Sequence, residues 1–117
     1  MKIQNFKDLR IWQDSMDFTE QIYKLSRKFP KEELYGVTSQ IRRSAVSIPS
    51  NIAEVFMRFS NKEFKHFLFI ALASSAEVET QLILCERLGY LPKPKMTEFS
   101  ESIDRLNRMI MTLIKKL

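Results

Sequence analysis

The spacing of apolar residues between positions 37 and 56 constrains the fold more than any other feature. Apolar side chains recur there every three or four residues: Val37, Ile41, Ala45, Ile48, Ile52 and Phe56. An α-helix turns once every 3.6 residues, so this spacing places all six on one face. A helix with one apolar face has to bury that face against other elements. The stretch therefore predicts a helix over about residues 37–58 that packs in a helical core.

A second row of residues follows the same helix about 100° around its axis. This row is polar and consists of Gln40, Arg43, Ser47, Asn51 and Glu54. Polar helix faces commonly point to solvent. Serine and asparagine, however, are poor residues inside a helix, because their side chains compete for backbone hydrogen bonds. The row therefore predicts either a solvated face or a polar network, packed within the subunit or against a neighbouring subunit.

A matching polar row lies on the helix predicted over residues 61–88 and consists of Ser74, Glu77 and Gln81. We expect the two rows to face each other, with Glu77 neutralising the charge of Arg43. A buried pair of this kind would serve register and assembly more than net stability. Pro49 adds a further constraint, because inside a helix it removes one backbone hydrogen bond.

Three other helices are predicted, over about residues 7–28, 61–88 and 97–116. The expected apolar face of the first helix consists of Leu9, Trp12, Met16, Thr19 with Ile22 or Tyr23, and Leu25. Short connections make consecutive helices antiparallel. The predicted fold is therefore all-α, an antiparallel up-and-down four-helix bundle that forms a single domain over residues 1–117.

The limits of the third helix are marked by specific residues. Ser60 followed by Glu63 three positions later is a capping box, which begins a helix. Gly89 is a typical residue at a helix end, and Pro92 and Pro94 should keep the helix from resuming at once. The third helix is therefore expected to end at about Leu88.

The segment from Gln40 to Glu54 resembles the signature of the four-helix-bundle proteins encoded in intervening sequences of bacterial 23S rRNA genes. The resemblance continues in Phe6-Lys7-Asp8-Leu9 with Trp12-Gln13, Phe29-Pro30, Arg58-Phe59-Ser60-Asn61-Lys62-Glu63-Phe64 and Glu77-Val78-Glu79-Thr80-Gln81-Leu82. It implies an antiparallel bundle that assembles into a homo-oligomeric ring, commonly a pentamer, with no established enzymatic activity.

The chain departs from the family pattern just after this signature. Where such proteins usually carry Glu-Gly-x-Gly, this chain reads Glu54-Val55-Phe56-Met57. Glycine adopts the left-handed conformation of a helix cap without steric cost, whereas β-branched Val55 resists it. We therefore expect the second helix to continue to about Met57 or Phe59.

The composition limits the compartment and the class of partner. A net charge of +5 favours an anionic partner without requiring one. The single cysteine, Cys85, allows no internal disulfide. The residues after Met1 lack the apolar run of a signal peptide, and the longest uninterrupted apolar run, residues 67–73, is too short to span a bilayer. A cytoplasmic protein with no membrane partner is the prediction.

Catalytic and metal sites find little support in the sequence. Glu63 and His66 form a Glu-x-x-His string, but a di-metal bundle needs two such strings and His66 is the only histidine. Nineteen helical residues separate His66 from Cys85 by about 28 Å, so the two cannot form a dyad. No glycine-rich phosphate-binding loop is present. We therefore predict a protein that is not an enzyme and that has no metal site and no cofactor.

Two classes of non-catalytic function remain open. The first is an oligomeric protein that binds structured RNA or another nucleic acid through basic surfaces, because phosphate contacts give affinity with little sequence specificity. The candidate contacts are Arg10, Arg42, Arg58, Lys62 and Lys65. The alternative is an assembly or adaptor module that acts through protein–protein contacts alone, for which the large apolar residues Phe56, Met57 and Phe59 would supply interface.

Overall fold

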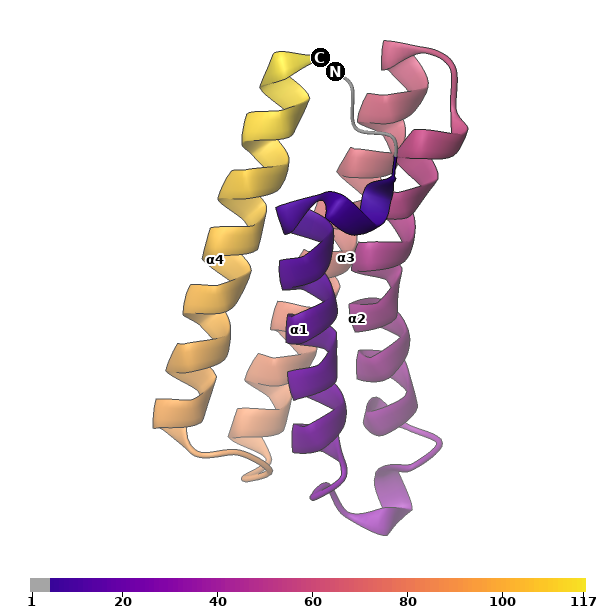
Figure 1. Cartoon of the computed structure of the whole chain (residues 1–117). Coiled ribbons are helices and arrows are strands. Elements are labelled where there is room, and N and C mark those ends of the chain that lie inside the picture. Colours follow the sequence, from indigo (N-terminus) through magenta and orange to yellow (C-terminus); the bar gives the residue numbers. More distant parts are fainter. Residues whose placement is uncertain (1–4) are drawn as a thin grey trace.

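The computed structural model describes residues 5–117, so residues 1–4 of the predicted domain lie outside the described part. Four α-helices run alternately down and up (Figure 1). Their bounds are α1 Arg10–Ser26, α2 Val37–Glu54, α3 Asn61–Arg87 and α4 Lys93–Lys116. Three short 3₁₀ turns accompany them at Phe6–Asp8, Lys31–Glu33 and Val55–Met57. The all-α, antiparallel four-helix bundle predicted from the sequence is confirmed.

The core lies between the four helices and is built from aliphatic side chains of all of them. The α2 face predicted from spacing is correct at its centre, where Ile41, Ala45, Ile48 and Ile52 are fully buried. Its two ends, Val37 and Phe56, are partly buried and pack against the same core. Each fully buried aliphatic side chain stabilises the fold by about 1.5–3 kcal/mol.

The predicted apolar face of α1 is correct at Leu9, Thr19, Ile22 and Leu25, which are buried. Met16 is exposed, and Trp12 is only partly buried, with an edge-to-face contact to Phe6. The buried residues of α1 are Ile11, Ser15, Phe18, Thr19, Ile22, Leu25 and Ser26. Ser15 lies in the core with its hydroxyl donating to the Trp12 carbonyl at 2.8 Å, so a residue that looks polar in the sequence occupies a core position.

Several helix ends differ from their predicted positions. The first α-helix begins at Arg10 because Leu9 is extended, and the preceding 3₁₀ turn is capped by the Asn5 side chain. The fourth helix begins four residues earlier than expected, at Lys93, with Pro94 in its first turn. Proline is tolerated there because the first N–H groups of a helix have no intrahelical acceptor.

The ends of α2 and α3 follow their local sequence. After Glu54 the chain tightens into the 3₁₀ turn Val55–Met57, and Arg58 is extended, so the absent glycines are replaced by a turn without left-handed residues. Ser60 caps α3 by accepting from the Glu63 N–H at 3.2 Å. The Glu63 carboxylate accepts from the N–H of Phe59 and not from that of Ser60. Gly89 has a positive φ of 82° and ends α3 as predicted.

Pro49 does not interrupt α2, because another helix supplies the hydrogen bond that proline cannot make. In a regular helix the N–H of residue 49 would bond the carbonyl of Ala45, and proline has no N–H. The Thr19 hydroxyl of α1 lies 3.2 Å from this carbonyl and 2.8 Å from that of Ser15. Thr19 is buried, so the contact ties α1 to α2 inside the core.

This contact predicts a coupling between Thr19 and Pro49. Thr19→Val keeps the side-chain shape but removes the donor, and we expect it to lower the free energy of unfolding by about 1–3 kcal/mol. In a Pro49→Ala background the new N–H can bond Ala45, so the same substitution should cost less. Urea unfolding of the wild type, both single variants and the double variant measures the difference. Equal costs in both backgrounds would contradict the assignment.

Candidate functional site

The polar rows of α2 and α3 meet in one seam inside the subunit. The Ser74 hydroxyl of α3 donates to the Ser47 hydroxyl of α2 at 2.8 Å. Asn51 donates to the same Ser47 oxygen at 3.0 Å and to the Ser47 carbonyl at 2.8 Å. Small side chains that satisfy one another let the two helices approach closely, and α2 and α3 are the most closely packed pair in the bundle. Of the alternatives left open by the sequence, the structure places this part of the row in intramolecular packing.

The expected pairing of Arg43 with Glu77 is wrong. Ser44 is the α2 residue that lies opposite Glu77, and its hydroxyl is 3.5 Å from the Glu77 carboxylate. Arg43 is exposed and makes no ion pair with Glu77. It precedes Ser44 by one residue, which turns its side chain about 100° away, toward the solvent side of the helix.

The remaining members of the two rows differ in exposure. Gln40 is exposed at the beginning of α2, and its carbonyl accepts from Ser44 at 3.0 Å. Glu54 is half-buried at the end of α2. Gln81 is half-buried on α3, and its side-chain oxygen accepts no hydrogen bond from the described residues. That oxygen is buried and Glu54 pairs with Arg58, so of the α2 row only Gln40 and Arg43 are exposed to contacts beyond the subunit.

Two of the predicted nucleic-acid contacts are tied into the subunit. The Arg42 Nε donates to the Ser26 hydroxyl at 2.8 Å, and its guanidinium lies over the Tyr23 ring at 4.9 Å. Arg58 pairs with Glu54 at 2.6 Å and covers the Phe67 ring at 4.6 Å. Arg42 thus fixes α1 against α2, and Arg58 fixes the α2–α3 turn.

The other three predicted contacts lie at one end of the bundle. Arg10 begins α1 with an 84% exposed side chain that is 3.7 Å from Asp14. Lys62 and Lys65 lie in the first two turns of α3, the former exposed and the latter half-buried. The end of α4 is at the same end of the bundle, since Asn61 donates to the carbonyl of Leu117 at 3.0 Å (Figure 1).

We call this end of the bundle the basic end. It comprises Lys7, Arg10, Arg58, Lys62, Lys65, Lys115 and Lys116. Lys115 and Lys116 were not among the contacts predicted from the sequence, because the spacing along one helix does not show that the end of α4 lies beside the beginning of α3. The predicted antiparallel topology carried that information, since it brings the end of the fourth helix to the beginning of the third.

The solvent-facing side of α3 carries several large apolar residues that the sequence analysis did not single out, beside exposed Thr80 and Arg87. Phe69, Ile83, Leu84 and Leu88 are each 40–52% exposed. Ala73 and Ala76 are exposed between them. By length and composition α3 could cross a membrane, a criterion that a core helix of a bundle also meets, yet only 33% of its most apolar 18-residue window is buried. The signal was present in the sequence, since Phe69, Ile83 and Leu84 lie outside the buried face of α3, and apolar residues on a second face of a helix are usually covered by another element.

The apolar residues predicted to supply an interface lie in and just after the turn that precedes α3. Phe59 is 98% exposed, Met57 is exposed and Phe56 is half-buried. We call Phe69, Ala73, Ala76, Ile83, Leu84 and Leu88 the α3 face.

The nucleophile and metal-ligand candidates are poorly placed for chemistry. Cys85 is fully buried, and burial together with the nearby Glu33 carboxylate raises the pKa of its thiol to about 11. At neutral pH the thiol is therefore protonated and shielded from reagents. His66 is exposed, with its ring edge-on to Phe67. Within residues 5–117, no group of three or more His, Cys, Asp or Glu side chains is arranged to hold a metal ion.

A tyrosine fixes the end of the bundle opposite to the basic end. The Tyr90 hydroxyl, just after α3, donates to the Glu33 carboxylate at 2.8 Å. Only the neutral phenol can donate this hydrogen bond, so the bond raises the pKa of Tyr90. The contact joins the α1–α2 and α3–α4 connections, so this end has a structural explanation.

Comparison with known proteins adds the family. The model of the 23S rRNA-intervening sequence proteins matches residues 7–112, nearly the whole chain. The chain belongs to this family. No curated protein matches it. A solved structure from Bacteroides thetaiotaomicron, described as a protein of unknown function from the S23 ribosomal protein family, is similar at 26% identity and a TM-score of 0.82. The alignment covers 90% of this chain and 98% of that one. This 23S rRNA-intervening sequence protein therefore shares its bundle with that relative over almost its full length.

The seam yields a prediction about Ser47. Because Ser47 packs inside the subunit, Ser47→Phe should overfill the α2–α3 contact and lower the free energy of unfolding by about 1–3 kcal/mol. Ser50→Phe on the exposed side of the same helix is the matched control and should change it by less than about 0.5 kcal/mol. Urea unfolding of both variants checks this. Similar stability in the two variants would mean that the seam is open to solvent.

Proposed function

We propose that this protein is a non-enzymatic scaffold whose α3 face joins copies of the chain into a homo-oligomer. The observation that supports the proposal is the row of large apolar side chains left exposed on α3. Exposed apolar side chains gathered on one helix face typically mark a protein–protein contact. Thr80 and Arg87 are exposed on the same face and would supply polar groups within that contact. The two alanines in the row leave room for another helix to approach closely.

The size of the α3 face bears on the geometry of the assembly. From Phe69 to Leu88 the α3 face is about 28 Å long and presents a strip about 10 Å wide. A stable interface buries about 800 Å² on each partner. The strip alone supplies roughly a third of that area, so other exposed apolar residues such as Met57 and Phe59 should join the contact.

A ring is the form of assembly that the family resemblance implies, with five subunits as the usual number. A ring requires two different surfaces in contact, whereas one surface that meets its own copy gives a dimer. The mass of the assembly therefore distinguishes a ring from a dimer, and in a ring the α3 face would meet a different patch of the next subunit.

The assembly is tested by replacing apolar residues of the α3 face with acids. Phe69→Glu with Leu84→Glu should shift the protein from an oligomer toward the monomer mass in light scattering, because it buries two charges in the contact. The matched control is Leu34→Glu with Tyr35→Glu, since these apolar residues are at least about as exposed but lie in the α1–α2 connection. A monomeric wild type, or dispersal by the control alone, would overturn the proposal.

The second candidate function is binding of structured RNA through the basic end. It is supported by exposed cations contributed by α1, α3 and α4 at one end of the bundle, which an oligomer would present in several copies. Phosphate contacts of this type depend strongly on salt. Arg42 and Arg58 are less suited to this role, because each is held by contacts within the subunit.

The RNA hypothesis predicts a charge-dependent loss. Lys62→Glu with Lys65→Glu should weaken binding to duplex RNA and reduce the slope of log affinity against log salt by about one unit per lost phosphate contact. Arg27→Glu with Lys28→Glu, at the opposite end, is the control. Anisotropy titrations at several salt concentrations provide the measurement. If the wild type oligomer binds no RNA even at low salt, the alternative function as an adaptor for proteins alone is favoured.

A further inference from the structure

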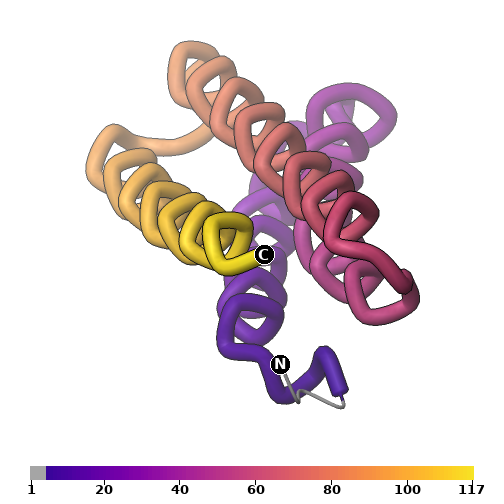
Figure 2. The backbone as a smooth tube through the Cα atoms, turned by 90° about the horizontal axis from the view of Figure 1, so that it is seen from above, coloured from indigo at the N-terminus to yellow at the C-terminus, as the bar shows by residue number. Residues whose placement is uncertain are grey.

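A groove runs along the bundle between α1 and α4. These two helices pack less closely than α1 with α2, α2 with α3 or α3 with α4. Figure 2 shows the four helices from above. Two adjoining hollows of about 600 and 390 Å³ lie between them, and Arg10 and Arg105 line both. The hollows extend from Lys95 to Lys116 on α4, which is about 30 Å of helix.

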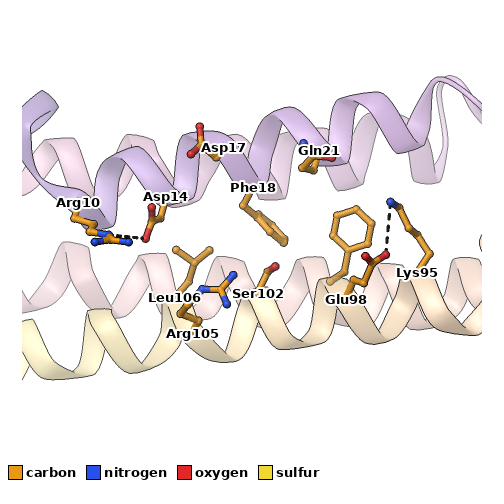
Figure 3. A pocket seen from close by; sticks show the side chains of 11 residues that line it. Arg10, Asp14, Asp17, Phe18, Gln21, Lys95, Glu98, Ser102, Arg105 and Leu106 are labelled. Carbon is orange, nitrogen blue, oxygen red and sulfur yellow. Dashed lines mark ion pairs between the residues drawn. The ribbon is translucent and has the colours of Figure 1, made fainter.

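The larger hollow has an aromatic floor and a rim of mixed charge. Phe18 and Phe99 meet edge-to-face on the floor with ring centroids 6.0 Å apart. Figure 3 shows the rim, where Arg10 lies 3.7 Å from Asp14 and Lys95 lies 3.6 Å from Glu98. The positive and negative charges largely balance in this half of the groove.

The smaller hollow is different, because every charged residue that lines it is a cation. The charged residues are Arg10, Arg105, Arg108 and Lys116. Its apolar lining consists of Leu9, Ile11, Met109 and Leu113. Arg105, Arg108 and Lys116 form no ion pair with any residue of the described chain. Like charges around a shared hollow repel one another, and an anionic partner would relieve that repulsion.

The lining also indicates which anionic partner fits. No aromatic side chain lines the smaller hollow, so it offers no platform on which a nucleic-acid base could stack. Phosphate groups alone would leave its apolar floor without a contact. A long apolar groove between two antiparallel helices matches an amphipathic helix, whose apolar face packs on the floor while its charges meet the rim.

We propose that the α1–α4 groove binds an amphipathic α-helix of a protein partner, with acidic residues of that helix placed against Arg105, Arg108 and Lys116. The groove accommodates about 20 helical residues. The acidic residues belong at the end of the partner helix that lies nearest the basic end of the bundle. The rest of the partner helix lies on the larger hollow and should carry little net charge there. This site is separate from the α3 face and does not depend on the oligomer.

The test uses a synthetic 20-residue helical peptide with leucines at helical spacing and glutamates beside them at one end. We expect it to bind the full chain in anisotropy titrations. A peptide with lysine in place of glutamate, and one with serine in place of leucine, should each bind at least about tenfold more weakly. These two peptides separately test the cationic rim and the apolar floor.

Charge reversal in the protein locates the site. Arg105→Glu with Arg108→Glu should weaken binding of the acidic peptide by about tenfold or more. The matched control, Arg27→Glu with Arg87→Glu, changes two exposed arginines outside the groove and should bind as the wild type does. If the groove variant proves unstable by thermal melting, Arg105→Gln with Arg108→Gln replaces it. The peptide should also bind the Phe69→Glu/Leu84→Glu variant. The oligomer proposal and the groove proposal can therefore fail independently, and the experiment distinguishes the two failures.

Three results would overturn the proposal. The first is that the acidic peptide does not bind the wild type. The second is that the groove variant and the control variant lose peptide affinity equally. The third is that the protein binds duplex RNA and not the peptide, and that the groove variant abolishes this RNA binding. The last result would assign the groove to nucleic acid.

Discussion

The hydrogen bonds between α2 and α3 hold the centre of this bundle in register, and the other helices are attached to that pair. The Ser47 and Ser74 hydroxyls meet at 2.8 Å, which is possible only where both side chains are small and each satisfies the other. On one side, Thr19 and Arg42 link α1 to α2. On the other, the Ser75 hydroxyl of α3 donates to Asn107 of α4 at 2.7 Å. Within residues 5–117, no side-chain hydrogen bond joins α1 to α4. The bundle is thus a chain of three linked helix pairs with one unlinked junction, and the groove lies at that junction.

Much of the fold could be predicted because local rules agreed with the tertiary structure. The apolar spacing of α2, the cap at Ser60 and the stop at Gly89 each express a requirement of a single helix. The burial of Ser15 in α1 could not be predicted in the same way. Ser15 is buried because its own helix satisfies its hydroxyl, and hydrophobic spacing gives no weight to that possibility.

The candidate surfaces were harder to predict, since they depend on which helices become neighbours. The sequence predicted the polar rows of α2 and α3, and it also indicated Lys62 and Lys65 as candidate contacts for nucleic acid. It could not show that Ser44, one residue from Arg43, would face Glu77, or that Arg42 would be held by Ser26 and Tyr23 of another helix. Charged side chains reach several ångströms, so their partners are decided by the arrangement of helices and not by spacing along one of them.

The unlinked junction also has a consequence for how the protein moves. Local opening of a protein begins where the fewest buried contacts are broken. Separating α4 from α1 breaks no side-chain hydrogen bond among the described residues, whereas separating α2 from α3 exposes the paired serines and the closest packing in the molecule. We therefore expect the amide hydrogens of α4 to exchange with solvent through smaller, more frequent openings than those of α2 and α3. The bundle would then have a rigid half, α2 with α3, and an outer helix whose motion changes the width of the groove.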